Sequence, residues 1–514
     1  MQKLVIGIDL STTTCKAIAW DARGLLVAQA RAPLGLSRPA PNAYEQDPED
    51  WWRATQQALK ALIPLIPGAA IAAVSIVNQR ETVAVTDAED RLLRPAMLWL
   101  DERRKDEVAT LCQRVGHERL HRITGKPHDW APAIYSLAWL ADAEPERFRR
   151  IRHVYEPHAW LVRKLTGQFV TSWASADPFG AFDIHQHRWA DDVLGALPIP
   201  LDSGCFPTAF APGSVLGAVT EAAETLTGLP AGTPVVAGGG DGQAGGLGIG
   251  VVSAGTAYLN LGTAIVSGVY ANTPLVNDAF RTLCAIDRQG YVLETSLRSG
   301  TLLINSLLKQ FFDIDVVAQP DSLIRLEIEA SRVAPGSAGL LLLPYWNGVM
   351  NPYWDQDARG CLLGLSPDHG RAQIYRAVLE GIALEQAVAT EHMVQATGEP
   401  VHTFVAIGGG AASRLWCQIM ADITDRPVIR ATTQEASSLG AGIAAAVGAG
   451  WYQDFASAAQ VMTQDGETFL PNPALREFHR ELLALYGELY PRLRDLYPRL
   501  ARLSPGPTPA LNQR

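Results

Sequence analysis

A single acidic residue, Asp241, lies in a stretch of glycines and small apolar residues, VVAGGGDGQAGGLGIG (residues 235–250). Two kinds of chemistry fit this pattern. Gly240, Gly242 and Gly245 spell G-x-G-x-x-G, the pattern of a dinucleotide-binding turn. Alternatively, the glycines bare a carboxylate at the end of a strand, where it can accept the proton of a substrate hydroxyl.

The residues that follow argue against dinucleotide binding. Such a site needs an acidic residue about 20 positions further on to hold the ribose, and residues 251–270 contain no Asp or Glu. Asp241 would also place a negative charge beside a pyrophosphate. We therefore exclude a NAD-dependent oxidoreductase and interpret Asp241 as a general base.

Two turns between expected strands carry hydroxyl groups and glycine, a composition that suits phosphate binding. Tight turns present backbone N–H groups and hydroxyls to an anion without a helix. The chain has no G-x-x-x-x-G-K-[ST] motif, so a P-loop is excluded. Either turn alone also fits a plain hairpin, but one in each half of the chain indicates a nucleotide site. The first turn contains Ser11, Thr12, Thr13 and Thr14, and the second contains Gly262 and Thr263.

Charged residues flank the first turn. Asp9 is placed to hold Mg²⁺, with Asp241 as a second carboxylate, since Mg²⁺ usually takes one or two carboxylates together with substrate phosphates. Lys16 adds a point charge for the phosphates.

A third glycine turn, Gly408-Gly409-Gly410-Ala411, lies between an expected strand and a helix that begins near Ser413. Glycines here let a flat ring or a phosphate approach the backbone and the helix N-terminus. Tight packing of the strand on the helix is an equally good reason for the same residues.

Polar residues also follow two apolar strands. Gln79, Arg80 and Glu81 come directly after AVSIV, and an arginine donor beside a glutamate acceptor can bind vicinal hydroxyls. WLDER (99–103) adds Asp101 after another strand. The alternative for each group is a surface ion pair.

The elements that position these residues alternate between strands and helices, which predicts an α/β architecture. LVIGIDLSTTTCKAIAW predicts a strand, a turn and a strand. DPEDWWRATQQALKALIPLI has the apolar spacing of a helix, with Asp47 at its start, where a cap belongs. TAYLNLGTAIVSGVY (256–270) repeats the first pattern, which suggests two related halves joined near residues 245–256. Amphipathic helical turns follow residue 475, and the tail SPGPTPALNQR is expected to fray.

Composition excludes several classes of protein. The 514 residues carry a net charge of −10 without a run of Lys or Arg, so a nucleic-acid partner is not expected. No apolar stretch reaches the ~18 residues of a membrane span, and the N-terminus lacks the apolar core of a secretory signal. Six scattered cysteines without C-x-x-C predict a reducing, cytoplasmic setting. HQH (185–187) is interpreted as a solvated turn and not a metal site.

The sequence GCLLGLSPDHGRAQIYRAVLE (360–380) resembles the C-terminal signature of the FGGY carbohydrate kinases, and IDLSTTTCK, GGGDG, NLGT, IGGGAASRLW and EASSLGAG follow that family's order. The resemblance covers residues 3 to about 490. It implies an α/β fold of two actin-like, ribonuclease-H-type domains with a catalytic cleft between them. We place these domains at residues 1–250 and 251–490, followed by a helix end and tail at 491–514.

The resemblance also implies ATP-dependent phosphorylation of a sugar or polyol hydroxyl, with ATP and Mg²⁺ bound and Asp241 as the base. It assigns the two hydroxyl-bearing turns to the phosphates and Asp9 to Mg²⁺. The positions it assigns to the nucleoside are Gly300, Thr301 and Asn305 near the adenine, with Gly409, Gly410, Ala411 and Ser413.

Different motifs of the chain resemble family members with different substrates. YEQDPEDWW, GGGD and LNLGT are similar to xylulokinases, whereas NQRET and PYWDQDARG are similar to glycerol kinases. Gln243 and Trp130 are candidates for family contacts that Gly242 and Ala131 do not supply. We expect D-xylulose as the substrate, with glycerol or another polyol as the alternative and a homodimer left open. The non-enzyme alternative is a nucleotide-switched regulatory protein on the same scaffold.

Overall fold

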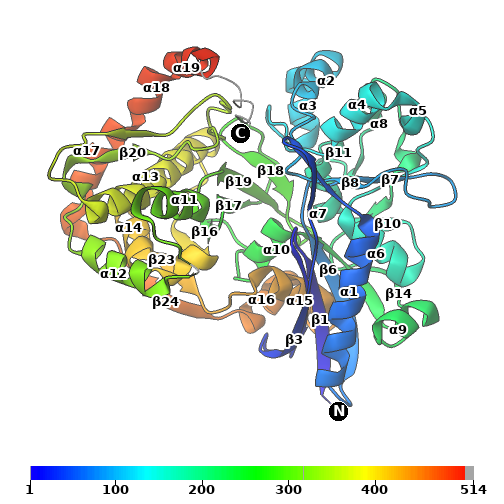
Figure 1. Ribbon diagram of the computed structural model, residues 1–514. Helices are drawn as coiled ribbons and strands as arrows, with labels where there is room; N and C mark the ends of the chain where they lie inside the picture. The colour runs from blue at the N-terminus through cyan, green and yellow to red at the C-terminus, as the bar shows by residue number, and fades with distance from the viewer. Residues whose placement is uncertain (1, 317, 504–514) are drawn as a thin grey trace, which may run out of the picture. The chain divides into compact units, whose positions relative to one another are not determined.

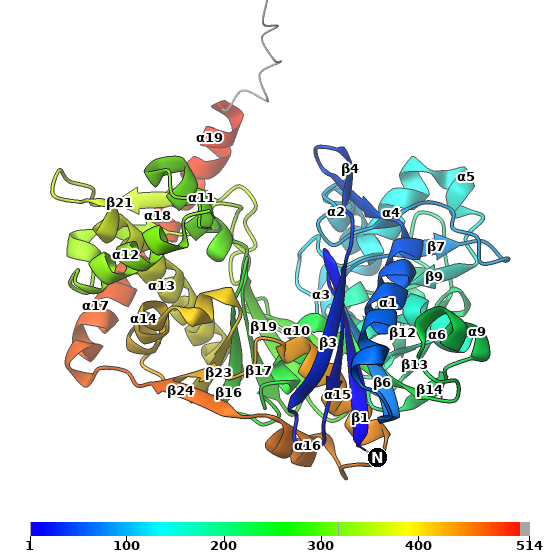
Figure 2. The ribbon, with the colours of Figure 1, turned by 60° about the horizontal axis from the view of Figure 1, so that its bottom comes forward.

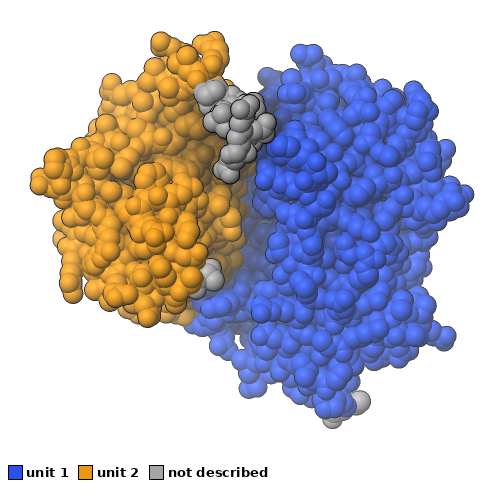
Figure 3. Space-filling view, in the orientation of Figure 1, with its two compact units in different colours: residues 1–258, 268–294, 431–465 blue, residues 259–267, 295–430, 466–514 orange. Residues whose placement is uncertain are grey.

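The computed structural model describes residues 2–316 and 318–503, so the predicted tail SPGPTPALNQR lies outside the described residues. The chain forms two compact units (Figure 3). Unit 1 contains Met1–Tyr258, Gly268–Glu294 and Ala431–Asp465, and unit 2 contains Leu259–Ser267, Thr295–Arg430 and Gly466–Arg514. The predicted α/β class is confirmed. The domain boundaries at residues 250 and 490 stay a prediction.

Two large sheets carry the fold, one of six strands in the order β14-β15-β6-β1-β2-β3 and one of seven in the order β18-β19-β17-β16-β22-β23-β24. Their bounds are β1 (Lys3–Leu10), β2 (Thr14–Trp20), β3 (Leu26–Pro33), β6 (Ala70–Asn78), β14 (Val215–Ala218), β15 (Pro234–Gly240), β16 (Thr256–Leu261), β17 (Ile265–Ala271), β18 (Arg281–Cys284), β19 (Tyr291–Leu297), β22 (Thr403–Ile407), β23 (Val428–Ala431) and β24 (Asp465–Phe469).

Short strands make up the smaller sheets. They are β4 (Ser37–Ala40), β5 (Ala43–Gln46), β7 (Ala84–Thr86), β8 (Ala96–Met97), β9 (His153–Tyr155), β10 (Val170–Ser172), β11 (Phe182–Asp183), β12 (Arg188–Trp189), β13 (Thr208–Phe210), β20 (Leu341–Leu343) and β21 (Cys361–Leu363).

The helices divide between the units. Unit 1 has α1 (Pro48–Leu62), α2 (Glu107–Val115), α3 (His117–Thr124), α4 (Ile134–Ala143), α5 (Pro145–Phe148), α6 (Pro157–Thr166), α7 (Trp173–Ala176), α8 (Asp191–Leu194), α9 (Glu221–Thr227), α10 (Asp241–Leu247), α15 (Ala436–Gly448) and α16 (Phe455–Met462). Unit 2 has α11 (Thr301–Phe312), α12 (Pro320–Ser331), α13 (Arg371–Thr397), α14 (Arg414–Thr424), α17 (Arg476–Gly487), α18 (Leu489–Leu493) and α19 (Tyr497–Leu503).

Both faces of the six-stranded sheet are covered. Alternate residues of β1 point to opposite faces: Leu4, Ile6, Ile8 and Leu10 belong to the core under α1 and α6, whereas Val5 belongs to the core under α15. Figures 1 and 2 show α1 and α6 on one side of β1 and β6 and α15 on the other. The sheet is therefore a buried central layer.

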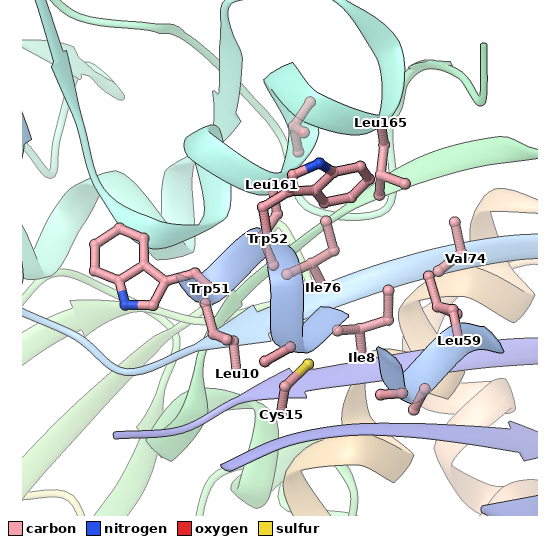
Figure 4. Close-up of a cluster of buried hydrophobic side chains, with 14 of the residues drawn as sticks. Ile8, Leu10, Cys15, Trp51, Trp52, Leu59, Val74, Ile76, Leu161 and Leu165 are labelled. Carbon is pink, nitrogen blue, oxygen red and sulfur yellow. The ribbon is translucent and has the colours of Figure 1, made fainter. Parts of the chain in front are cut away.

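Tryptophans of α1 fill the first of these cores. Trp51 and Trp52 are buried and lie with Ile8, Ile76 and Leu161, which come from β1, β6 and α6 (Figure 4). The helix starts as its sequence predicts, because the Asp47 side chain accepts a hydrogen bond from the Glu49 N–H and caps its first turn.

The other predicted elements are also confirmed. The strand–turn–strand patterns form β1–β2 and β16–β17, and IGGGAASRLW forms the end of β22, a glycine turn and the start of α14. The turns expected after residue 475 form α17, α18 and α19. No helix among the described residues is long and apolar enough to cross a membrane.

Candidate active site

Several of the predicted site residues of unit 1 lie at one edge of its sheet. Strands β1, β6 and β15 are parallel, and Asn78 at the end of β6 lies beside Leu10 of β1 and Gly240 of β15. Asp9 therefore lies near the carboxyl end of the first strand, and Asp241 directly follows the third. Ligands of open α/β sheets bind at this edge, and the strand order explains why residues so far apart in sequence meet here.

Asp241 is the first residue of α10, and its carboxylate stays partly open. Its side chain is 40% exposed, and its Oδ1 atom lies 3.2 Å from Arg80 Nε. The same Oδ1 accepts a hydrogen bond from the Gly242 N–H at 2.8 Å. Loss of water around the group raises the pKa of Asp241, against the lowering effect of Arg80. A carboxylate with a raised pKa is a better proton acceptor.

Asp9 is buried deeper and is unsatisfied. It is 8% exposed, and its Oδ1 atom has no hydrogen-bond partner in the described part of the chain. The pKa of Asp9 is raised to about 7, mainly by burial and then by the nearby Asp241, whereas Lys16 lowers it. The Lys16 Nζ itself lies 2.6 Å from Glu435 Oε2. Because the neighbouring Asp241 helps to raise the pKa of Asp9, a cation bound beside Asp9 would be stabilised.

A buried cluster of ion pairs holds Arg80 and Glu81. Arg80 Nη1 lies 3.0 Å from Glu294 Oε2, and Arg281 bridges Glu294 Oε1 at 2.6 Å and Glu81 Oε1 at 2.8 Å. The Tyr258 hydroxyl donates to Glu294 at 2.6 Å. Arg80 and Glu81 therefore pair with strands β18 and β19 rather than form the exposed ion pair that was the alternative.

Electrostatics keep this cluster charged. Burial opposes the ionisation of Glu294, but Arg281, Arg80 and the Tyr258 hydroxyl outweigh it and lower the pKa of Glu294 to about 2. Glu81 also has a left-handed backbone, with φ of 52°. Such a conformation persists in a non-glycine residue only where its surroundings fix it, and here Arg281 holds its side chain.

The glycines around Asp241 are explained mainly by protein packing. A Cβ on Gly238 would lie 1.9 Å from Ile76 O, and one on Gly248 would lie 1.9 Å from Ala436 O. A Cβ on Gly242 would lie 3.1 Å from both Arg80 Nη2 and Glu294 Oε2. The glycines thus let α10 pack closely on its neighbours and leave Asp241 as the one side chain directed out of this region.

The turn at Ser11–Thr14, predicted to bind phosphate, is tied to the end of β6 by hydrogen bonds. The Ser11 N–H and hydroxyl both donate to Thr14 O at 2.9 Å. Gln46 Nε2 donates to Thr12 O at 2.6 Å, and Gln46 Oε1 accepts from Gln79 Nε2 at 3.0 Å. Gln79 is 1% exposed, so in this structure it orders the turn.

In unit 2 the second turn meets the start of α11. The N–H groups of Gly300 and Thr301 donate to Thr263 O at 2.9 Å and Gly262 O at 2.8 Å. The positions assigned to phosphate and to adenine are thus adjacent. Asn305 is exposed on the next turn of α11.

The glycine turn after β22 packs on the same strand end. A Cβ on Gly408 would lie 2.4 Å from Asn260 Oδ1, and one on Gly410 would lie 2.8 Å from Leu261 O. A Cβ on Gly409 would meet no atom within 4 Å. Packing explains Gly408 and Gly410, whereas the open face at Gly409 leaves room for a ligand.

The remaining predicted residues have protein partners of their own. Asp101 is fully buried and accepts from Tyr44 N and Arg103, and Gln243 Nε2 donates to Ala174 O at 3.0 Å. Trp130 is 7% exposed with the Arg104 guanidinium 5.6 Å from its ring centroid. Ala411 is buried, and Ser413 caps α14 through its hydroxyl and Trp416 N. Their substrate and nucleotide contacts stay predictions.

Sequence reasoning missed several residues of the site: Gln46, Asn260, Arg281, Glu294 and Glu435. Gln46, Asn260 and Glu435 carried a signal, since they lie in YEQDPEDWW, NLGT and EASSLGAG, whereas Arg281 and Glu294 carried none. Within the described residues, no group of three or more His, Cys, Asp or Glu side chains could hold a metal ion by itself. Asp9 and Asp241 would therefore need phosphate or water as further ligands.

Comparisons with known proteins agree with this geometry. Models of the FGGY family of carbohydrate kinases match residues 4–248 (N-terminal domain) and 257–449 (C-terminal domain). The chain is 34% identical over 432 residues to xylulose kinase of Escherichia coli strain K12, covering 82% of this chain and 85% of that one. It is similar to the crystal structure of xylulose kinase from Rhodospirillum rubrum (29% identity, TM-score 0.88, 96% and 99% coverage) and to that of gluconate kinase from Lactobacillus acidophilus (26% identity, TM-score 0.90, 97% and 100% coverage).

Proposed function

The chain belongs to the FGGY family of carbohydrate kinases, and from that premise we propose that it transfers the γ-phosphate of ATP to D-xylulose, with Asp241 as the catalytic base. Xylulose kinases from several bacteria are 27–34% identical to it over most of its length. The membership also answers the non-enzyme alternative, because this family consists of enzymes.

The main support for Asp241 as the catalytic base is the environment of its side chain. Its carboxylate is partly exposed at the carboxyl edge of the sheet, and Arg80 Nε holds Oδ1 at 3.2 Å. In the reaction, Asp241 takes the proton of the sugar hydroxyl as that oxygen bonds to the γ-phosphorus. The bond from the γ-phosphorus to its bridging oxygen breaks, and ADP leaves.

The residues around Asp9 fit a magnesium ion. The Asp9 Oδ1 atom, which has no hydrogen-bond partner in the described part of the chain, and the neighbouring Asp241 would supply oxygen ligands. Mg²⁺ is usually bound by only one or two carboxylates, and substrate phosphates supply further oxygens. When bound, Mg²⁺ would neutralise charge on the phosphate oxygens. Lys16 would add a positive charge beside them.

We assign the nucleotide to turns in both units. Ser11, Thr12, Thr13 and Thr14 would donate to phosphate oxygens, as would Gly262 and Thr263. The open face at Gly409 would receive the nucleoside together with Gly300, Thr301, Asn305, Gly410, Ala411 and Ser413.

A polyol such as glycerol is the second candidate substrate. Arg80 and Glu81 place a guanidinium and a carboxylate near the base. They would bind adjacent hydroxyls of either a ketopentose or a polyol by exchanging their pairs with Glu294 and Arg281. Gln79, Asp101, Trp130 and Gln243 are assigned to the same substrate site, on the assumption that binding rearranges their present contacts.

The test is ADP release, coupled to NADH oxidation, with D-xylulose, L-xylulose, D-ribulose, gluconate and glycerol as acceptors. A control without sugar measures the background hydrolysis of ATP. We expect the highest kcat/KM with D-xylulose. A higher kcat/KM with glycerol would identify a polyol as the substrate. Background rates with every acceptor would refute both candidate substrates.

A further inference from the structure

Strand β15 carries a bulge three residues before Asp241. Val236 pairs with Ser75 of β6 and Gly239 pairs with Val77, so Ala237 and Gly238 together face the single residue Ile76. Bulges next to active sites redirect the side chains that follow them. The bulge therefore determines how the chain enters α10 and where it delivers the carboxylate.

The backbone groups of the bulge leave the β6 ladder and need other partners. The Ala237 N–H donates to Ser214 O at 2.9 Å, and the Ala237 carbonyl accepts from the Gly213 N–H at 2.7 Å. The Gly238 N–H donates to His158 Nε2 at 3.3 Å, and the Gly238 carbonyl accepts from Ser172 Oγ at 2.6 Å. Two buried side chains thus satisfy both polar groups of Gly238.

The partners of His158 fix its tautomer. Nε2 accepts from Gly238, so the proton is on Nδ1, which lies 3.2 Å from Thr171 Oγ1. The Thr171 hydroxyl in turn donates to Glu156 Oε1. His158 is fully buried, and burial lowers its pKa to about 3, so the ring is neutral and Nε2 is free to accept.

The same network reaches the strand beside the bulge. Ser175 Oγ lies 3.0 Å from Glu156 Oε2 and 2.9 Å from Asn78 Oδ1, and its single proton can serve either oxygen. Asn78 is the β6 partner of Gly240 and lies two residues before Arg80. One cluster of buried polar side chains therefore supports the strand ends that carry both Asp241 and Arg80.

We propose that His158 and Ser172 are positioning residues, which hold the Gly238 bulge and thereby set the place of the Asp241 carboxylate beside Arg80. The proposal rests on the proposed role of Asp241 as the base. Neither residue is assigned a contact with sugar or nucleotide.

The test compares two replacements of His158. His158→Leu removes the acceptor and keeps much of the bulk, and we expect kcat to fall about 10–100-fold with KM for ATP within about twofold of wild type. His158→Gln returns an acceptor near the position of Nε2 and should recover most of kcat. The acid limb of the pH profile should also move to higher pH in His158→Leu, because Asp241 loses the contact with Arg80 that lowers its pKa.

Two further variants keep the test decisive. His479→Leu removes a buried imidazole of unit 2, whose Nδ1 lies 3.1 Å from Asp422 O, and controls for a general loss of stability. Ser172→Ala removes only the donor to Gly238 O and serves if His158→Leu does not fold; its kcat should also fall.

The outcomes separate the two proposals. A folded His158→Leu or Ser172→Ala protein with wild-type kcat would overturn the positioning role. An active Asp241→Asn protein would instead overturn the base assignment, whatever the His158 variants do.

Discussion

At the scale of single residues, the site depends on how neighbours change the charge of two carboxyl groups. Burial raises the pKa of Asp241 and Arg80 opposes it, so the group can be ionised yet still accept a proton. Asp9 has a raised pKa and an unsatisfied oxygen. The types of these residues were visible in the sequence, but their pKa shifts depend on contacts with Arg80, Glu81 and Lys16 that only the fold creates.

We expect kcat/KM to decline toward acid pH, because a protonated Asp241 cannot take the proton of the hydroxyl. Arg80→Gln removes the positive charge that lowers the pKa of Asp241, so its acid limb should lie at higher pH than in wild type. Arg103→Gln, which instead loses pairs with Asp101 and Glu45, is the matched control. Identical acid limbs in wild type and Arg80→Gln would contradict the contact between Arg80 and the base.

The raised pKa of Asp9 predicts that the stability of the folded protein depends on pH. Its pKa in the fold is about 7, raised from 3.8, so folding favours the protonated form. The stability that it contributes is present at low pH and is lost as the pH rises through about 7. Without Mg²⁺, the Tm of Asp9→Asn should therefore exceed that of wild type by a margin that grows between pH 3.8 and about pH 7 and is constant above that range.

Adding Mg²⁺ above pH 7 should raise the Tm of wild type and leave that of Asp9→Asn unchanged, since the Asp9 carboxylate is the proposed ligand. Thermal unfolding of both proteins measures each effect. A constant difference across pH would mean that Asp9 is not the titrating group.

At the scale of elements, the sequence predicted those features that depend on interactions between residues close in sequence. The apolar spacing and Asp47 cap of α1 and the β1–β2 hairpin appear as expected, because each depends on residues close in sequence. Arg281 and Glu294 were not predicted. They meet Arg80 and Glu81 only because β18 and β19 bring them there from about 200 positions away, and nothing in their own surroundings reveals it.

The glycine turn after β22 gives a matched pair of variants. Gly409→Ala adds a methyl group to open space, so the protein should keep its Tm. KM for ATP should rise about tenfold, because the methyl group occupies the space proposed for the nucleoside. Gly408→Ala forces a Cβ to within 2.4 Å of Asn260 Oδ1 at a φ of +85°, and should lower Tm itself. A wild-type KM for ATP in Gly409→Ala would argue against a nucleoside at this turn.

At the scale of the whole molecule, the chain was predictable as a family member with an α/β fold in two related halves. The composition of the two compact units was not predictable, because residues 431–465 belong to unit 1 although they lie between two segments of unit 2 in sequence. Within unit 1 their helix α15 covers the sheet through close contacts such as that of Gly7 in β1 with Ser438. Such contacts require small residues. The sequence shows where the small residues lie but not which residues they contact.

The central claim is that Asp241 is the base of an ATP-dependent sugar kinase. The most direct test is a single-turnover assay that measures sugar phosphate formed from γ-labelled ATP and D-xylulose by wild type and by Asp241→Asn, alongside the Kd of each protein for ATP. We predict phosphorylated sugar from wild type and a rate about 10²–10⁴-fold lower from Asp241→Asn, with the Kd for ATP unchanged. Asp241→Asn turning over at the wild-type rate would contradict the account.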